Sequence, residues 1–239
     1  MAPAGFWRRA AAWSLDAAAV ALLVLPPALF RRDAAGARLA EAWTDLLDLL
    51  AQRTAGALLE AIDAGAQTAL EALPRLAGAL FAAPALREAA LPLQSALLAW
   101  AGPPLAAYAL AFLLWSVGFE RSRLQATPGK RALGLRVAGA DGAPARTGRL
   151  LLRFLAGGLS WLSLNAGHAL AAIGPDHLAL HDRISGTRVL RAPGTPAGLP
   201  GWARGWLFLL AAGLAAATAW GAAALAGALD AALDRALWG

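Results

Sequence analysis

The sequence predicts an all-α integral membrane protein with about three transmembrane helices, one further membrane segment that is re-entrant or a fourth crossing, a small cytoplasmic β element and an amphipathic helical insert. Composition is the first reason. Of the 239 residues, 59% are apolar and 15% are charged, whereas about a quarter of the residues in a soluble domain are charged. The mean hydropathy is +0.54. The apolar residues also collect into runs long enough to cross a bilayer.

Charge and cysteine usage exclude several classes of function. The chain has no Cys, which removes disulfides, thiolate metal sites and cysteine nucleophiles. The formal net charge is +6, but 20 of the 21 cations are Arg that lie mainly beside apolar runs. This placement is typical of contacts with phospholipid head groups rather than with nucleic acid. We therefore expect a lipid bilayer as a partner and no nucleic acid.

The first crossing is predicted over Ala10–Phe30, a run of 21 residues with one ionisable side chain, Asp16. At about 1.5 Å per residue, such a helix spans the hydrocarbon core. Arg8 and Arg9 precede it and form a cationic collar that favours a cytoplasmic N-terminus. A cleaved signal peptide is the alternative, which Asp16 and the Pro26-Pro27 pair disfavour.

Two further crossings are predicted later in the chain. The run Pro103–Phe119 has only 17 residues, so a helix that begins earlier and kinks at Pro103 would supply the missing length. The run Gly205–Leu229 is bounded by Trp202 and Trp206 on one side and by Asp230 on the other, and it predicts the third crossing.

The segment Phe154–Ile173 is ambiguous because Gly, Ser, Asn and His dilute its apolar character. If it does not cross, the segments 1–9, 120–153 and 174–204 share one side and hold 14 of the 21 cations. A crossing would place the last of these segments outside and break the positive-inside bias. A re-entrant or interfacial segment is therefore the favoured interpretation, and a fourth crossing is the alternative.

Two short runs predict a small sheet. Gly134-Leu-Arg-Val-Ala and Gly186-Thr-Arg-Val-Leu each begin with Gly and carry strand-forming residues. Pairing requires both runs to lie on the same side of the membrane, which agrees with the charge count.

Residues 34–72 carry apolar side chains at steps of three and four, which predicts an amphipathic helix that is broken or bent near Gly56 and Gly65. This stripe comprises Leu39, Trp43, Leu46, Leu50, Leu59, Ile62, Ala66 and Leu70. The helix is expected to rest on the membrane surface or on the other helices, and binding of a partner is the alternative.

Asp16 is the main candidate for a functional residue because a carboxylate inside a membrane helix needs a partner or a water-filled cavity. Arg9 lies on the same helical face but points away toward the N-terminus. Arg153 is therefore the first candidate partner of Asp16. An ion- or proton-coupling site and a structural pair between helices both remain open.

The run Thr127-Pro-Gly-Lys-Arg predicts a tight turn at Pro128-Gly129, after which Lys130 and Arg131 anchor lipid phosphates. It lacks the spacing of a phosphate-binding loop. His177 and His181 lie four apart, but Gly174-Pro175 leaves little room for a helix, so we expect no metal site. No catalytic residue and no cofactor are predicted.

Four blocks of sequence strongly resemble the RDD family of bacterial membrane proteins. They are Arg9–Asp16, Thr127–Pro144, Arg153 and His181–Val189. The resemblance covers about 6–32 and 97–191, and it identifies Arg9, Asp16 and Asp182 as the arginine and two aspartates of the family name. It implies a membrane domain over 6–191, interrupted by the insert 34–96 and followed by a linker and C-terminal transmembrane helix over 192–239. The insert and the last helix depart from the family pattern.

A few members of that family have been linked to sodium–proton antiport, so the resemblance implies a transporter rather than an enzyme. We expect exchange of a small cation for protons, with Asp16 as the reversible carboxylate and Arg9 and Asp182 as a cytoplasmic gate. Asp182 is expected to fix the turn into the second strand by accepting backbone N–H groups or by pairing with Arg9 or Lys130. The alternative is a non-transporting scaffold or accessory subunit whose insert binds a protein partner. The expected location is the bacterial cytoplasmic membrane, multi-pass, with a homo-oligomer as a further expectation.

Overall fold

The structure is a computed structural model that describes residues 2–29, 34–65, 68–81 and 84–238. The chain forms two compact units. Unit 1 comprises Met1–Leu29 and Leu105–Ala211, and unit 2 comprises Phe30–Pro104 and Ala212–Gly239. The predictions made for Phe30 and Ala66 lie outside the described residues.

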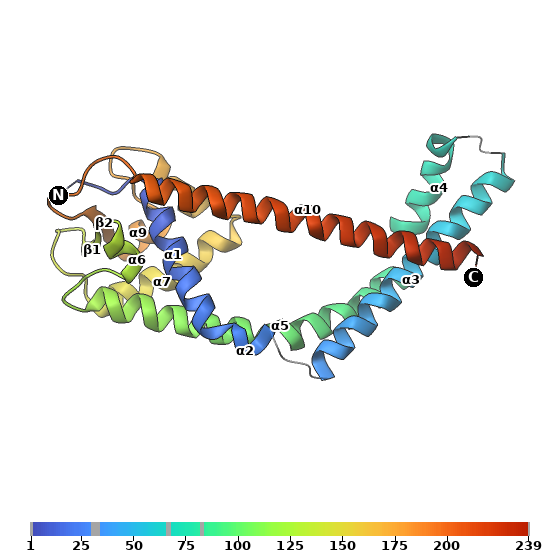
Figure 1. The fold of residues 1–239 in the computed structure, drawn as a ribbon, viewed down its shortest axis with the longest axis horizontal. Coiled ribbons are helices and arrows are strands. Elements are labelled where there is room, and N and C mark those ends of the chain that lie inside the picture. Colours follow the sequence, from blue (N-terminus) through green and yellow to red (C-terminus); the bar gives the residue numbers. More distant parts are fainter. Residues whose placement is uncertain (1, 30–33, 66–67, 82–83, 239) are drawn as a thin grey trace. The chain divides into compact units, whose positions relative to one another are not determined.

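Unit 1 is mostly helical and carries one small sheet (Figure 1). Two long helices, α5 and α10, each contribute residues to both units. The elements with residues in unit 1 are α1 (Phe6–Val24), α2 (Pro26–Leu29), α5 (Pro84–Arg121), α6 (Pro128–Ala132), β1 (Leu135–Gly139), α7 (Thr147–Leu162), α8 (Ala166–Ala169), the 3-10 helix η1 (Leu170–Ala172), α9 (Leu180–Ser185), β2 (Thr187–Arg191) and α10 (Gly201–Trp238).

The two predicted strands pair, which confirms the expected β element. β1 and β2 are antiparallel, with Val137 opposite Val189. The N-terminal segment bonds to the other edge of β2, where Ala4 N–H donates to Val189 O at 3.0 Å and Arg191 N–H donates to Ala2 O at 2.9 Å. The start of α1 is thereby fixed beside the sheet.

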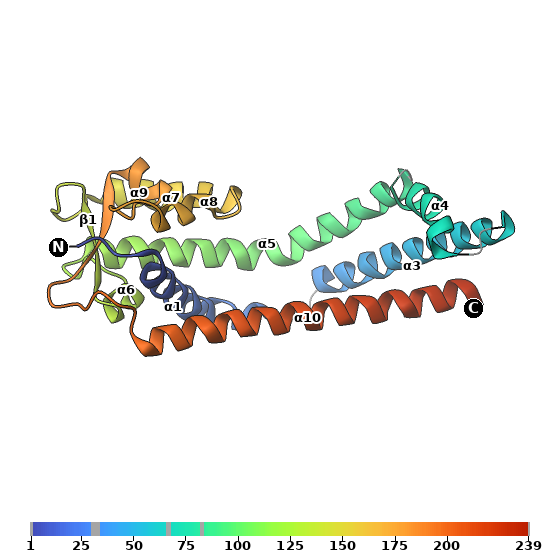
Figure 2. The same cartoon turned by 90° about the horizontal axis from the view of Figure 1, so that it is seen from above.

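The core of unit 1 lies where α1, α7 and the sheet meet. Leu133, Val137 and Leu150 are its largest fully buried apolar side chains. Ala11 and Ala12 on α1 belong to the same core, and their small side chains let the helix backbone lie close to the apolar side chains of the sheet. The views in Figures 1 and 2 agree that β1, β2, α6 and α9 gather at one end of α1 and α7.

The ambiguous segment folds as a helix that turns back. α7 buries Leu150, Arg153, Ala156 and Ser160 at steps of three and four. After α7, Leu164 and Asn165 adopt left-handed backbone conformations, and the returning chain packs α8 and α9 against α7. The pairing of β1 with β2 requires this return. The placement of the segment in the bilayer stays a prediction.

Unit 2 contains α3 (Ala34–Asp63), α4 (Ala69–Phe81), and the parts of α5 and α10 assigned to it. The predicted break near Gly65 is confirmed because α3 ends at Asp63 and Gly65 has φ +84°. α3 passes through Gly56 without a break, so of the two alternatives predicted there only a bend stays a prediction.

The face that α3 buries also differs from the expected leucine stripe. The buried side chains are mainly alanines, and Leu59 and Ile62 are exposed. Small side chains permit close contact between helix backbones, which leaves the larger apolar residues outward.

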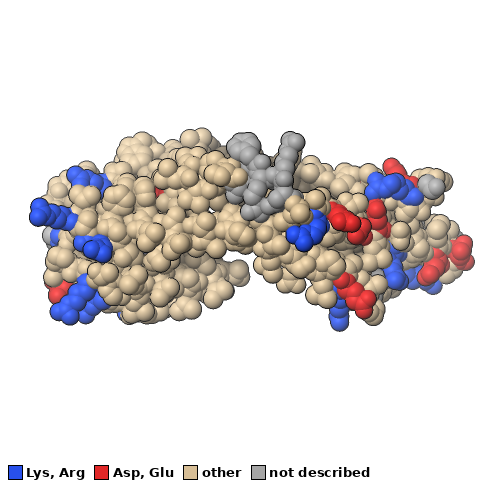
Figure 3. Space-filling model, turned by 90° about the horizontal axis from the view of Figure 1, so that it is seen from below, with Lys and Arg blue, Asp and Glu red and all other residues tan. Residues whose placement is uncertain are grey.

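Two helices, α5 and α10, are long and apolar enough to cross a membrane by length and composition. α5 begins at Pro84, so the helix expected at Pro103 does begin earlier. α1 has 19 residues, of which Arg8, Arg9 and Asp16 are charged. The number of crossings stays a prediction. Lys and Arg gather at the sheet end of unit 1, whereas most of the rest of its visible face is uncharged (Figure 3).

Candidate functional site

A buried ion-pair cluster around Asp182 joins three helices of unit 1. Asp182 Oδ2 accepts a hydrogen bond from Arg9 Nη2 at 2.6 Å, and Oδ1 accepts one from Arg153 Nη1. The side chains of Asp182, Arg153 and Arg9 are 0, 9 and 11% exposed. The predicted pairing of Asp182 with Arg9 is confirmed, and Arg153 is a second partner.

Local structure explains why Asp182 holds this position. It is the third residue of α9, and its Oδ2 also accepts the N–H of Ala179 at 2.9 Å, as acidic side chains do in the first turn of a helix. α9 ends at Gly186, whose φ of +61° lets the chain turn into β2. The short helix α9 begins only at Leu180, so it carries His181 but not His177, which agrees with the expectation that Gly174-Pro175 leaves little room for a helix bearing both histidines.

Arg153 also connects the cluster to the sheet. Its Nη1 donates to Thr187 Oγ1 at 2.9 Å, and the Thr187 and Ser185 hydroxyls lie 2.8 Å apart. Arg9 Nη1 donates to the carbonyl of His177 at 2.6 Å. The two arginines therefore hold α1, α7, α9 and β2 together.

The cluster sets the ionisation of its neighbours. Burial alone would raise the pKa of the Asp182 carboxyl, but the charges of Arg153 and Arg9 outweigh burial and hold the pKa well below its usual range. Burial, followed by the charge of Arg153, lowers the pKa of His181 to about 2. His181 is therefore neutral near pH 7. Its Nε2 lies 3.4 Å from Arg9 Nη2, so we assign Nε2 as the acceptor and Nδ1 as the protonated nitrogen.

Lys130 lies inside unit 1 rather than at lipid phosphates, which corrects the expected anchor. Its Nζ lies 2.6 Å from Glu120 Oε1, and the two side chains are largely buried. Thr127 caps α6, and its Oγ1 accepts the N–H of Lys130 at 3.4 Å. The turn of this short helix directs Lys130 inward and leaves Arg131 exposed. The role of Arg131 as a lipid anchor stays a prediction.

Asp16 is separate from the cluster, and its expected pairing with Arg153 is wrong. The carboxylate is buried and accepts hydrogen bonds from Gly129 N–H at 2.8 Å, from Trp115 Nε1 at 3.1 Å and from the Thr127 hydroxyl. Arg153 pairs with Asp182 because the buried face of α7 packs on α9. Asp16 instead joins α1 to α6 and α5 through neutral donors.

Arg8, which the sequence predicts in a cationic collar beside the first crossing, is turned into the interior of unit 1. Its guanidinium is buried and donates to the carbonyls of Leu133 at 2.9 Å, of Pro196 at 2.8 Å and of Gly198. These contacts tie α1 to the segment between β2 and α10. The adjacent pair Arg8-Arg9 offered no signal that both side chains turn inward.

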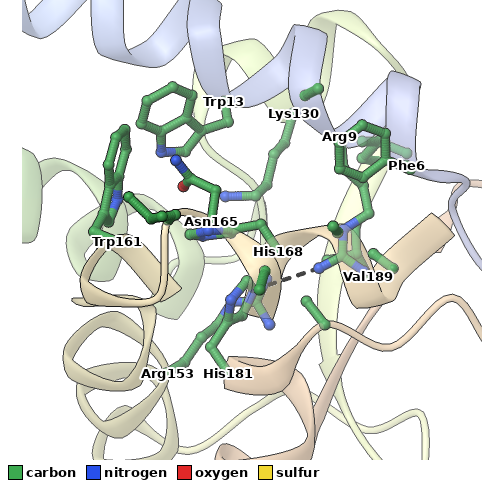
Figure 4. Close-up of a pocket in the computed structure, with 17 residues that line it drawn as sticks. Phe6, Arg9, Trp13, Lys130, Arg153, Trp161, Asn165, His168, His181 and Val189 are labelled. Carbon is green, nitrogen blue, oxygen red and sulfur yellow. Dashed lines mark hydrogen bonds between the residues drawn. The ribbon is translucent and has the colours of Figure 1, made fainter. Parts of the chain in front are cut away.

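A cavity of about 450 Å³ lies against the cluster (Figure 4). Three cationic residues, Arg9, Lys130 and Arg153, line it together with His168 and His181. No Asp or Glu is among the described residues that line this cavity. Asp182, which pairs with Arg9 and Arg153, is not among the lining residues.

The remaining walls of the cavity are mainly apolar. Trp13 and Trp161 stand on one side and Phe6 and Val189 on the opposite side (Figure 4). A concave apolar site with a few polar groups is the usual form of a binding pocket for a small molecule.

Several hydrogen-bond donors beside this cavity are unused. Both hydrogen bonds of Arg153 to described residues are made by Nη1, so Nη2 and Nε remain for another acceptor. His181 is 8% exposed, and its Nδ1 has no partner among the described residues. The described residues contain no group of His, Asp or Glu suited to a metal ion.

The buried Arg–Asp–Arg cluster and the cation-lined pocket thus belong to a mostly helical chain that has two apolar helices of membrane length. The RDD family model matches residues 3–186, and the chain belongs to the RDD family. Of the family residues, Arg9 and Asp182 form an ion pair and Asp16 lies apart. The match ends before β2 and α10. No curated protein and no solved structure matches the chain.

Proposed function

We propose that this membrane protein of the RDD family binds an anionic ligand in the cavity lined by Arg9, Lys130 and Arg153, as a binding or transport protein rather than an enzyme. The observation that carries the proposal is the lining itself, with three cations and no acid among the described residues.

The charge balance supports this proposal. The five ion-paired groups of the site are Arg9, Arg153 and Lys130 against Asp182 and Glu120, which leaves one net positive charge. His181 adds no charge because its pKa is lowered to about 2. A buried excess charge is costly without a counter-ion, so a bound anion would stabilise the site.

The available donors support the same ligand chemistry. Arg153 has guanidinium N–H groups at Nη2 and Nε that make no hydrogen bond to a described residue. Guanidinium groups bind carboxylates and phosphates with charge-assisted hydrogen bonds.

The test is a titration of the full-length protein, purified in a neutral detergent, with inorganic phosphate and with acetate by calorimetry. Arg153→Gln should weaken binding at least tenfold, because it removes the charge and the free donors. Arg149→Gln is the matched control, since Arg149 lies one turn earlier on α7 with an exposed side chain. Lys130→Gln provides a second variant if Arg153→Gln does not fold. A wild-type protein that binds no anion would overturn the proposal.

Exchange of a small cation for protons at Asp16 is a second candidate. The observation in its favour is that Asp16 is 2% exposed and receives its hydrogen bonds from neutral groups, with no Arg or Lys paired to it among the described residues. Such a carboxylate could bind either a proton or a cation. Against this, Asp16 does not line the cavity described above.

Reconstituted proteoliposomes test this candidate. Asp16→Asn should fold and lose cation-driven proton movement, whereas Asp141→Asn, in an exposed turn, should keep it. A folded Asp16→Asn protein that exchanges at the wild-type rate would remove Asp16 from the mechanism. A wild-type protein with neither anion binding nor cation-dependent proton flux would favour the scaffold that binds a partner through 34–96.

A further inference from the structure

We infer that the ligand of this cavity is an anionic amphiphile, with a phosphate or carboxylate head at Arg9, Lys130 and Arg153 and an alkyl chain along the aromatic wall. The inference rests on the proposed function and names the class of its ligand. The inference follows from the position of the cationic side chains, which lie beside cavity walls made of aromatic and aliphatic side chains.

A second cavity of about 390 Å³ shares part of the polar lining of the first, and Ser116 and Glu120 add further polar groups to its otherwise largely apolar wall. Lys130, Arg153, His168 and His181 line both cavities. An anion bound at these residues would therefore have apolar space on more than one side.

Aromatic rings form a continuous series from the polar residues into the second cavity. His181 and His168 have ring centroids 5.2 Å apart, and Trp161 lies 6.2 Å from His168. Trp161 lies 5.5 Å from Trp13, which lies 6.2 Å from Phe112.

Beyond these rings, Phe112 contacts both Tyr108 at 5.9 Å and Phe154 at 6.2 Å between centroids, and these three residues line the second cavity. A small hydrophilic anion would bury no apolar surface against this wall. An alkyl chain that lay along the wall would bury apolar surface and gain binding free energy.

The apolar wall is also open to the outside of unit 1. Trp161 is 54% exposed and Leu164 is 94% exposed, although both line the first cavity. The outward face of α7 adjoins them and carries exposed leucines throughout its length: Leu151, Leu152, Leu155, Leu159 and Leu162. Exposed apolar faces of membrane proteins contact acyl chains. An amphiphile could therefore enter sideways from the lipid phase, with its head reaching the cations.

Two glycines of α7 leave room for the chain. Gly157 and Gly158 line the second cavity, and a Cβ built on either would meet no atom within 4 Å. A larger side chain at Gly157 would therefore fill the proposed chain path without straining the backbone.

The experiment measures binding of dodecyl phosphate, hexyl phosphate and inorganic phosphate to the full-length protein in nanodiscs of zwitterionic phosphatidylcholine. Affinity should rise with chain length, by up to about three- to fourfold for each methylene that is buried. Dodecanol, which has the chain without the charge, should bind at least tenfold more weakly than dodecyl phosphate.

Gly157→Leu should reduce the ratio of dodecyl phosphate to inorganic phosphate affinity at least tenfold. Gly148→Leu is the matched control on the same helix, because a Cβ there also meets nothing within 4 Å and Gly148 lines neither cavity. It should keep the wild-type ratio.

Equal affinity for inorganic and dodecyl phosphate, or an unchanged ratio in Gly157→Leu, would overturn the amphiphile while leaving the proposed anion site intact. Failure of the wild-type protein to bind any of the phosphates would overturn both.

Discussion

The carboxylate of Asp182 offsets the repulsion between the two buried guanidinium groups of the site. Arg9 and Arg153 approach the same carboxylate from α1 and α7, one at each oxygen. Without that negative charge, two guanidinium groups would face each other in a region of low exposure. The residue is therefore a positioning group that presents both cations to the cavity.

Asp182→Asn should destabilise the protein by about 3–5 kcal/mol, the usual cost of leaving a buried ion without its partner. The melting temperature in detergent is the measurement. Asp176→Asn is the control, because Asp176 lies six residues earlier and is exposed. An Asp182→Asn protein that melts like the wild type would contradict the role of the carboxylate.

His181 should make stability depend on pH. Burial and then the charge of Arg153 depress its pKa in the folded protein to about 2, against about 6.5 in an unfolded chain. Between these two pKa values the unfolded state binds a proton that the folded state does not bind. The free energy of unfolding therefore decreases as the pH falls below about 6.5. Between pH 7 and 5 the loss should be about 1–2 kcal/mol. His181→Gln should show a smaller fall in melting temperature over this range, and a fall as steep as that of the wild type would refute the assignment.

At the scale of the elements, the turn before β1 supplies one of the contacts that hold α1 in place. Thr127 and Gly129 at the start of α6 donate to the Asp16 carboxylate of α1. A Cβ at Gly129 would collide with the Ala12 carbonyl oxygen and lie 2.8 Å from Asp16 Oδ2. Only glycine permits this approach, which explains the Pro-Gly sequence without a phosphate ligand.

Gly129→Ala should therefore destabilise the protein by about 1–3 kcal/mol, as overpacking of a filled site does. Gly118→Ala within α5 meets nothing within 4 Å and should be neutral or slightly stabilising, because alanine favours a helix over glycine. Thermal melting of both variants in the same detergent compares them. Equal melting temperatures would mean that the α1–α6 contact can relax.

At the scale of the whole molecule, the return of α7 through α8 and α9 decides on which side the last segments lie. β1 and β2 pair directly, so the chain before α7 and the chain after α9 meet at one end of unit 1. The exposed cations of both segments then gather at that end (Figure 3). This arrangement satisfies the positive-inside bias without a crossing by 154–173.

Gly142 and Thr195 should therefore both face the cytoplasm. Since the chain has no Cys, single Cys substitutions at the two positions can be labelled with a membrane-impermeant maleimide in intact cells and in inverted vesicles. Both should react only in inverted vesicles. Labelling of the two sites from opposite sides would show that 154–173 crosses the membrane.

The sequence by itself determined the class of protein, the strand pair and the family. Long apolar runs depend on composition, and a strand depends on local pattern, so both are visible along the chain. The similar runs at Gly134 and Gly186 indicated the sheet that the structure contains. Family membership followed from short blocks around Arg9 and Asp182.

Only the tertiary structure decided which charges meet. The sequence predicted Arg153 as the partner of Asp16, whereas the packing of α7 on α9 assigned it to Asp182. The inward turn of Arg8 and Lys130 likewise depended on carbonyls and on Glu120, which distant segments supply. A cavity forms where side chains from several elements leave space, and the spacing of residues along one chain does not encode that space.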